Sequence, residues 1–500
     1  MHSFPSPQPC AHPVQRTTPA LGTGSAAARR WHRLARCTAL AWAALLLGAC
    51  SSVRPWLNQP LPLPEQMPQA RRAALQHTAA RDPSMLVAVT LSGGGARASA
   101  FGFGVLSALQ EARYHWNGID TTLLNATDVV SGVLGGSIIA AYFAAYGIDG
   151  LPGFEQAFLR QNFQNSLISQ ALRPGNLIDL TSPWLGRSHL LARRLDGLYG
   201  GQTFGDVERR PRHPQLFISA TDMSLGAGFE FTWDQFALIC SDLSTVPLSF
   251  AVAASSAVPL LLSPMTLKNY ADRCQGRNYD ALALQAPDAG SGFRARLYRA
   301  HERTYLDVKR KPYIHLVDGG LADNLGVQRL LDRTLGSNGL HNAFTEVNVP
   351  PGSIRKLVLI TVNSERDPSQ NIDQTDTVPG MGQVVDTLLF GTGARATEET
   401  QEYLRDTIDQ WRKALADRTP GLSEAFAPGA QIHVVQVNLR DAPDDIARNA
   451  LLQVPTAFSI SDADVSALIE AGASVLHHSA DFKALMRSLQ PPVGNGVVPP

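Results

Sequence analysis

The chain has 500 residues, of which 44% are hydrophobic, and it carries 43 basic and 43 acidic side chains. This length and apolar content suffice for a large buried core, and the balanced charge gives no reason to expect nucleic acid as a partner. The balance is uneven along the chain, because the residues before Cys50 include five arginines and no acid. That basic stretch indicates a targeting segment.

Residues 1–49 have the layout of an export signal. The arginines precede a short apolar run, Thr38–Leu47, which is too short for a transmembrane helix. The run ends in Leu47-Gly48-Ala49-Cys50, which resembles the lipobox of bacterial lipoproteins. The resemblance implies removal of 1–49, lipidation of Cys50 and attachment to a membrane. The serine after Cys50 resembles the outer-membrane sorting pattern of Gram-negative bacteria, whereas an ordinary signal peptide with a chance cysteine is the alternative.

The composition divides the rest of the chain into a predicted tether, a folded domain and a tail. Residues 50–84 are rich in proline, which predicts an extended tether with one short helix over Gln69–His77. Residues 85–490 are expected to fold, and 491–500 to form a frayed tail. In an exported protein the two remaining cysteines, Cys240 and Cys274, could form a disulfide, and their spacing fits neither a zinc site nor a C-x-x-C motif.

The folded part begins with an α/β pattern. The apolar run Met85–Leu91 predicts a buried parallel strand, and a glycine loop and a helix follow it. A second strand, Ala126–Ser131, leads into a helix over Gly136–Tyr146, which together indicate an α/β fold with a parallel sheet. Further strands are predicted at Gln215–Ala220, Tyr313–Val317, Arg355–Val362 and Gln431–Leu439. Further helices are predicted at Leu248–Ser255, Gly326–Leu335, Gln383–Leu415 and Asp462–Leu489, and Asn269–Lys311 is expected to be an irregular insertion.

The second strand and its helix are joined as a nucleophile elbow. Hydrolases place a serine third in G-x-S-x-G at such a turn. Here the frame is Gly132-Val133-Leu134-Gly135-Gly136, so the nucleophile's position holds leucine. The scaffold of a serine hydrolase is therefore predicted without the attacking atom.

Two nearby serines are candidate substitutes. Ser137 completes half of an elbow motif, but it lies about one helical turn further on, where it should face packing. Ser131 is on the strand and should point elsewhere. No other G-x-S-x-G occurs in the chain.

The glycine loop after the first strand has three interpretations. Successive N–H groups of Gly93, Gly94, Gly95 and Ala96, with Arg97 beside them, would form an oxyanion hole at a helix N-terminus. A dinucleotide site is disfavoured, because the fingerprint is incomplete and no acidic residue follows a second strand for the ribose. The glycines could also serve only the tight turn.

A carboxylate follows a later strand. Asp318 comes directly after Leu316-Val317 and precedes two glycines, a place where α/β proteins build sites, so it could act as a base toward the elbow. Asp323 and Asn324 have the character of capping residues, and His315 that of a satisfied core histidine. No His, Cys and carboxylate cluster has metal-ligand spacing, so neither metal nor cofactor is expected.

Four motifs in order carry a family resemblance. They are residues 92–97, the elbow 131–137, Ala253-Ala254-Ser255-Ser256-Ala257-Val258-Pro259, and Asp318-Gly319-Gly320. Together they resemble a patatin-like phospholipase domain over about 86–489. The resemblance implies a three-layer α/β/α fold, a Ser–Asp dyad, an oxyanion hole in the glycine loop and lipid acyl esters as substrates. Asp318 takes the place of the dyad aspartate and Leu134 that of the nucleophile, and Ala98 stands where glycine is common.

Two functions remain open on these grounds. The first is a tethered lipoprotein that binds lipid or phospholipid acyl chains and has lost most ester hydrolysis. The second is an active lipid acyl hydrolase that uses another nucleophile.

Overall fold

The computed structural model describes residues 51–62, 82–274, 292–328, 330–332, 350–366, 376–387, 392–418 and 426–490. The chain divides into two units, 1–52 and 53–500, and the fold is that of the second unit. The predicted leader, Cys50, the helix over Gln69–His77 and the tail 491–500 lie outside the described residues.

One sheet organises the described part of the chain. Its strand order is β10-β9-β1-β4-β5-β8-β7, with β6 also paired to β5. The first five strands of this order run parallel, so the prediction of a mostly parallel sheet is confirmed. The strands are β1 (Met85–Leu91), β4 (Thr127–Val133), β5 (Gln215–Asp222), β6 (Ala227–Glu230), β7 (Met265–Lys268), β8 (Tyr313–Val317), β9 (Ile354–Asn363) and β10 (Phe426–Asn438).

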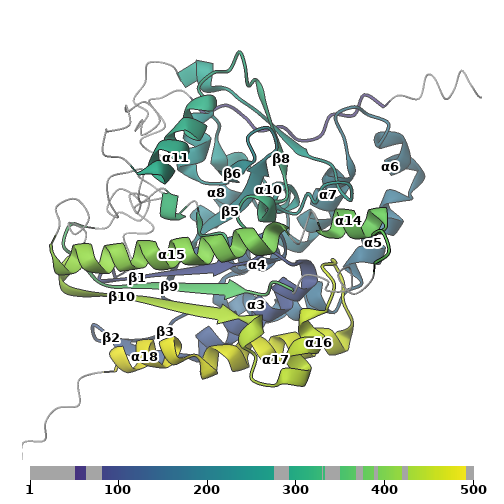
Figure 1. Cartoon of the computed structure of the whole chain (residues 1–500). Coiled ribbons are helices and arrows are strands. Elements are labelled where there is room, and N and C mark those ends of the chain that lie inside the picture. The colour runs from purple at the N-terminus through teal and green to yellow at the C-terminus, as the bar shows by residue number, and fades with distance from the viewer. Residues whose placement is uncertain are drawn as a thin grey trace, which may run out of the picture. The chain divides into compact units, whose positions relative to one another are not determined.

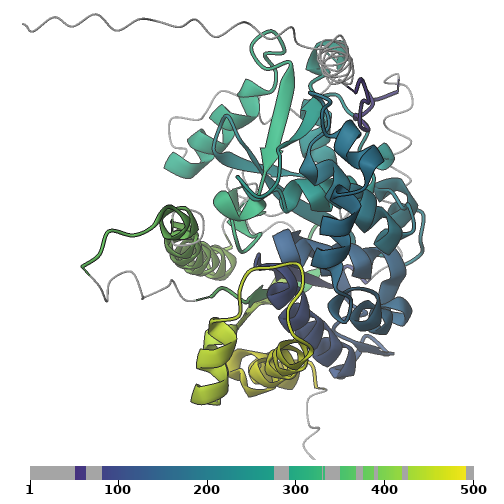
Figure 2. The same cartoon turned by 90° about the vertical axis from the view of Figure 1, so that its right-hand side faces the viewer.

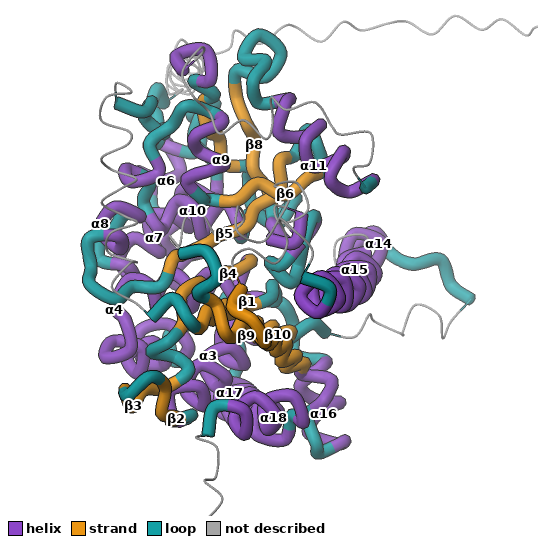
Figure 3. Tube along the Cα trace, turned by 90° about the vertical axis from the view of Figure 1, so that its left-hand side faces the viewer, coloured by secondary structure: helices purple, strands orange, loops and turns teal. Residues whose placement is uncertain are grey.

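Helices cover both faces of the sheet, which confirms the three-layer α/β/α expectation (Figure 1). Alternate residues of β1 show the division, because Val87 and Val89 pack into one core and Leu86 and Ala88 into the other. The first core is covered by α3 (Gly95–Glu111), α4 (Leu134–Gly150), α7 (Arg187–Tyr199), α10 (Leu248–Ser255), α17 (Asp462–His478) and α18 (Ala480–Ser488). The second is covered by α15 (Thr392–Ala416), which Figure 3 shows with α14 on one side of β9 and β10.

The parallel register brings the functional loops to one edge. Leu91 of β1 pairs with both Gly132 of β4 and Val362 of β9. The loops after these strands therefore meet at the carboxyl edge, where α/β proteins place their sites. Figure 2 looks onto this edge, because the parallel strands in Figure 1 point toward its right-hand side.

The direction of β8 differs from the sequence-based expectation. It pairs antiparallel with β5, and Val317 lies opposite Thr221 near the end of β5. Asp318 therefore does not follow a parallel strand, although the antiparallel strand still delivers it beside the carboxyl half of β5. His315 is exposed on β8, with Nδ1 3.0 Å from Thr266 Oγ1, so its prediction as a core residue is wrong.

Several helices differ from the sequence pattern. The polar stretch 269–311 contains α11 (Phe293–Thr304), whose buried side includes the charged Arg299 and Glu302 and so has a weak apolar signature. The predicted helix Asp462–Leu489 is two helices, because Ser479 ends α17 and caps the N-terminus of α18. The predicted helix Gln383–Leu415 is α14 (Met381–Asp386) and α15, with 388–391 outside the described residues. Of the predicted helix Gly326–Leu335, residues 329 and 333–335 also lie outside.

The remaining elements of the described part are short. They are the hairpin β2 (Arg113–Trp116) and β3 (Ile119–Thr122), and the helices α5 (Phe163–Ala171), α6 (Pro174–Asp179), α8 (Phe204–Glu208), α9 (Trp233–Leu238) and α16 (Asp445–Leu452). One described stretch, Leu134–Gly153, has the length and apolar character of a membrane span, but 72% of its most apolar window is buried in the domain. It is the core helix α4 with its continuation.

Residues 53–62, expected to belong to a free tether, pack on the domain instead. Asn58 is buried and donates from Nδ2 to Ser241 Oγ at 2.8 Å, and Pro60 forms a β-bridge with Ser241. Next to this bridge, Cys240 and Cys274 form a disulfide with a Cα–Cα distance of 5.8 Å.

Candidate active site

The elbow has the strained backbone that a nucleophile requires, although it carries leucine. Leu134 begins α4 directly after β4, and its φ of 45° lies in the left-handed region. For a residue other than glycine this conformation costs roughly 1–2 kcal/mol. It is held by Ser255, whose Oγ accepts from the Leu134 N–H at 2.8 Å and donates to the Ser219 carbonyl at 2.6 Å.

The elbow glycines are needed for close packing against the first glycine loop. A Cβ on Gly135 would overlap the carbonyl oxygen of Gly95, and one on Gly136 would overlap that of Leu91. The Gly136 N–H donates to the Ser92 carbonyl at 3.2 Å. The elbow and the glycine loop therefore form one rigid backbone assembly.

The Leu134 side chain occupies the place of the nucleophile. It is only 4% exposed and forms a small apolar cluster with Val133 and Val258. Its Cβ lies 3.5 Å from the point where Gly93 would carry a Cβ. An apolar group therefore sits at the centre of the site, between the elbow and the glycine loop.

The two substitute serines serve the backbone. The Ser137 hydroxyl is fully buried and donates to the Leu134 carbonyl at 2.6 Å, as a helical serine commonly does. The Ser131 hydroxyl donates to the Gly326 carbonyl at 3.1 Å. Neither geometry presents a free hydroxyl to a substrate.

The glycine loop keeps part of its expected donor set. Gly94 and Gly95 have φ values of 139° and 63°, which glycine adopts without strain. The Gly93 N–H donates to the Asn324 carbonyl and that of Ala96 to the Ala457 carbonyl. Among the described residues no acceptor is assigned to the N–H groups of Gly94 and Gly95. These two amides, at the N-terminus of α3, are the donors left for an oxyanion.

Arg97 is placed differently from its expected role beside the oxyanion. It is almost fully buried, and Nε donates to the Ser364 carbonyl at 2.9 Å while Nη1 donates to the Val454 carbonyl at 2.5 Å. Burial lowers the pKa of the guanidinium to about 9. These two hydrogen bonds of Arg97 thus connect the glycine loop to the segments that follow β9 and α16.

Asp318 is brought to the elbow by its own loop. A Cβ on Gly319 would lie 3.0 Å from Val133 Cγ1, and the Asp318 N–H donates to the Ala257 carbonyl at 3.0 Å. The carboxyl is buried, and Oδ1 accepts from the Gly320 N–H at 2.9 Å. Burial raises the pKa of Asp318 to about 7. A carboxyl that changes charge near neutral pH is suited to general-base work.

The two residues expected to cap and fix the loop do so. Asp323 accepts the N–H groups of Leu325 and Gln328 at 3.1 and 2.6 Å, and burial raises its pKa to about 7 as well. The Asn324 side chain lies between Gly93 and Gly320, because its Oδ1 would contact a Cβ on either glycine. Asn324 therefore fixes the Asp318 loop against the glycine loop.

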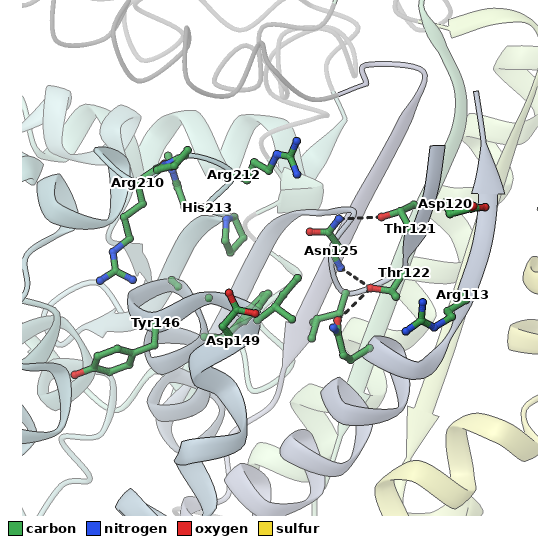
Figure 4. A pocket seen from close by; sticks show the side chains of 18 of the residues that line it. Arg113, Asp120, Thr121, Thr122, Asn125, Tyr146, Asp149, Arg210, Arg212 and His213 are labelled. Atoms are coloured by element: carbon green, nitrogen blue, oxygen red, sulfur yellow. Dashed lines mark hydrogen bonds between the residues drawn. The ribbon is translucent and has the colours of Figure 1, made fainter. Parts of the chain in front are cut away.

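One pocket of the described residues lies away from the elbow. A pocket of about 1020 Å³ is lined by the β2–β3 hairpin, the end of α4 and residues 210–214, which precede β5. Figure 4 shows Asn125 hydrogen-bonded to Thr121 and Thr122 in this wall. These elements lie at the amino edge of the sheet, at the opposite end of α4 from Leu134. Among the described residues no group of three or more His, Cys, Asp or Glu could hold a metal ion.

Comparisons with known proteins found one family match and several similar solved structures. Residues 89–331 match the family described as Patatin-like phospholipase, and no curated protein sequence matches the chain. Similar solved structures include human GIVD cytosolic phospholipase A2, with 12% identity, a TM-score of 0.39 and coverage of 87% of this chain and 66% of that one. VipD from Legionella pneumophila matches with 12% identity, a TM-score of 0.31 and coverage of 81% and 67%. The chain thus spans slightly less than two thirds of the human protein. The part of this chain that matches a patatin-like phospholipase domain is therefore residues 89–331, just under half of its length.

Proposed function

We propose that this protein is a membrane-anchored lipoprotein whose patatin-like domain binds lipid acyl chains and no longer hydrolyses their esters at the elbow. The observation that carries the proposal is Leu134 itself, held at φ 45° where the nucleophile belongs. Leucine has no nucleophilic atom, and loss of the serine lowers turnover about a million-fold in serine hydrolases.

Acyl-chain binding does not need the missing hydroxyl. Leu134, Val133 and Val258 already form a small buried apolar cluster at the elbow, and the amides of Gly94 and Gly95 are left as donors in the adjoining glycine loop. An acyl carbonyl could accept from these amides while its chain contacts the apolar cluster. Ligand binding can therefore persist in a site that has lost its attacking group.

A second candidate, an active lipid acyl hydrolase, is favoured by one observation. Asp318 is a buried carboxyl with a pKa of about 7 beside the elbow, which is the property a general base would need. This alternative requires a nucleophile other than residue 134, with Ser137 as the nearest hydroxyl.

The test compares four chains on short aryl esters and phospholipid vesicles: natural, Leu134→Ser, Leu134→Ala, and Leu134→Ser combined with Asp318→Asn. We expect turnover only in Leu134→Ser, with a loss of at least a hundredfold when Asp318→Asn is added. Measurable turnover by the natural chain that persists in Leu134→Ala would overturn the proposal. In that case abolition by Ser137→Ala would identify the active-hydrolase alternative.

The anchoring half of the proposal has its own test. Lipidation at Cys50 would hold the protein in the cell envelope, on the outer membrane by the sorting pattern. Cys50→Ala should move the protein from the membrane fraction to the soluble fraction. Unchanged fractionation would contradict the anchor while leaving the elbow argument intact.

A further inference from the structure

The segment next to the expected lipid anchor is fastened to the folded domain. The Val53 carbonyl accepts from the Ser182 hydroxyl at 2.7 Å, and Arg54 stacks over the Trp184 ring at 4.0 Å. Trp56 packs against Phe250 of α10 with ring centroids 4.6 Å apart. Together with the buried Asn58 and the bridge at Pro60, these contacts make residues 53–62 a strap on the domain surface.

The strap limits how far the domain can move from its anchor. Only Ser51 and Ser52 separate Cys50 from Val53, and the three residue-to-residue steps from Cys50 to Val53 span about 10 Å when extended. A lipid on Cys50 would therefore keep the start of the strap, and the Trp184 loop bound to it, within about that distance of the bilayer surface. A free tether of 35 residues would impose no such limit.

The surface around the strap is apolar and exposed. Trp184, which Arg54 covers on one side, follows the exposed Leu177 and Ile178 of α6, and Leu172 lies just before them. Monomeric proteins seldom expose such a group of large apolar side chains unless it contacts a partner or a membrane. Tryptophan in particular is enriched where proteins meet the membrane interface.

A second loop extends this surface toward the elbow. Arg187 donates from Nη2 to the Leu260 carbonyl at 2.7 Å, and Ser188 donates to Ser263. The loop exposes Leu260 and Leu261 by 67% and 63%. It directly follows Val258, which contacts Leu134. Contacts thus link the Trp184 side of the domain, through Arg187 and the Leu260 loop, to Val258 in the wall of the elbow.

The charge of this region is complementary to anionic lipid. Residues 160–200 contain five arginines and two aspartates, a net charge of +3, whereas the whole chain is neutral. Arg54, Arg173 and Arg187 are exposed beside the apolar side chains. Exposed arginines next to apolar groups favour anionic head groups at a bilayer surface.

We propose that the strap 53–62 holds the face formed by Leu172, Leu177, Ile178, Trp184, Leu260 and Leu261 on the bilayer that carries the Cys50 lipid. This orientation presents the elbow edge of the sheet, seen in Figure 2, to the membrane. The inference rests on the proposed anchoring at Cys50 and adds to it a defined face and a reason for its orientation.

The test uses the lipidated full chain in membranes that contain anionic lipid and lipid-borne nitroxide quenchers. A fluorophore is attached at Leu261→Cys or, as the matched control, at Asp120→Cys on the β2–β3 hairpin at the opposite edge. Both positions are exposed, so neither change should disturb folding. We expect quenching at 261 to exceed quenching at 120 at least threefold.

A third chain tests the strap without touching any of its contacts. Twenty Gly and Ser residues inserted between Ser52 and Val53 raise the reach of the anchor to about 25 Å. We expect an unchanged membrane fraction and at least a twofold loss of quenching at 261. Equal quenching at 261 and 120, or quenching unaffected by the insertion, would overturn this inference alone. Absence of the natural chain from membranes would overturn the anchoring proposal and this inference together.

Discussion

Replacing Asp318 by asparagine is expected to stabilise the fold at pH 8 and to change its stability little below pH 4. The carboxyl is buried, and its pKa is raised by burial from 3.8 to about 7. Asparagine keeps an acceptor oxygen for the Gly320 N–H, so the variant removes the ionisable group while retaining the hydrogen bond.

The direction in which the stability changes with pH follows from proton linkage. Because the folded-state pKa lies above the unfolded value, the folded chain binds more protons between the two values. The stabilisation by the protonated carboxyl is complete below the unfolded pKa and is lost as the pH rises through about 7. A pKa change from 3.8 to about 7 corresponds to roughly 4 kcal/mol at about 1.36 kcal/mol per pH unit. Against a typical total stability of about 5–15 kcal/mol, this effect is large.

The measurement is urea unfolding of the natural chain and Asp318→Asn at half-unit steps from pH 3.5 to 8. The free-energy difference should grow from near zero to about 4 kcal/mol in favour of the variant. The raised pKa of Asp323 acts in both chains and cancels in the difference. Asp149→Asn, at an exposed position on α4, provides a control that should show no such growth. A difference that does not change with pH would refute the reasoning from burial.

Three further substitutions test the packing around the site. Gly135→Ala should destabilise the domain by about 3 kcal/mol or more in thermal unfolding. The control Gly175→Ala should be tolerated, because a Cβ at Gly175 meets no atom within 4 Å. Equal effects of the two changes would contradict the close packing of the elbow. Cys240→Ala removes the disulfide that closes a loop between residues 34 positions apart, and it should lower the free energy of unfolding in urea by about 2–4 kcal/mol. An unchanged free energy of unfolding would contradict a stabilising disulfide in the natural chain. Arg97→Lys loses the planar fork to two carbonyls and should cost about 2–4 kcal/mol; a neutral result would show that these hydrogen bonds are dispensable.

The parallel core of the fold could be predicted because its signals are local. Met85–Leu91 is a continuous apolar run, and every residue of β1 is buried. Strands that are covered on both faces need such runs, and the glycines that follow them mark the turns at the carboxyl edge. The boundaries of β1 and β8 were therefore visible in the sequence.

The direction of β8 and the helices of the polar stretch could not be predicted in the same way. Tyr313–Val317 has the same residue pattern whether it pairs parallel or antiparallel, because pairing direction depends on the path of the distant chain. Helix α11 buries Arg299 and Glu302 beside Ala295 and Tyr298, and the two charged residues weaken the hydrophobic periodicity that would indicate it.

In the candidate site, too, the features set by short sequence motifs could be predicted and those set by contacts between distant residues could not. Motifs predicted the elbow, the glycine loop and Asp318, since each is a short backbone pattern. Ser255 contacts the Leu134 N–H across 121 residues, and Arg97 reaches the Val454 carbonyl across 357. Nothing near Arg97 in the sequence indicates that its donors are used by the C-terminal half of the domain. Its expected role toward an oxyanion therefore rested on proximity in sequence alone.

The presence of an aspartate at 318 bears on which of the two functions is correct. The hydrogen bond to Gly320 could be made by asparagine, which would avoid the loss of stability that ionisation causes above pH 7. Turn geometry therefore does not account for the carboxyl, whereas the proposed role of a proton acceptor beside the elbow would account for it. Asp318-dependent turnover in Leu134→Ser would show that this acceptor is still aligned with residue 134 and lacks only its hydroxyl. Turnover in Leu134→Ser that is indifferent to Asp318→Asn would instead leave the buried carboxyl without a chemical role, and the acyl-binding proposal would then rest on the apolar elbow alone.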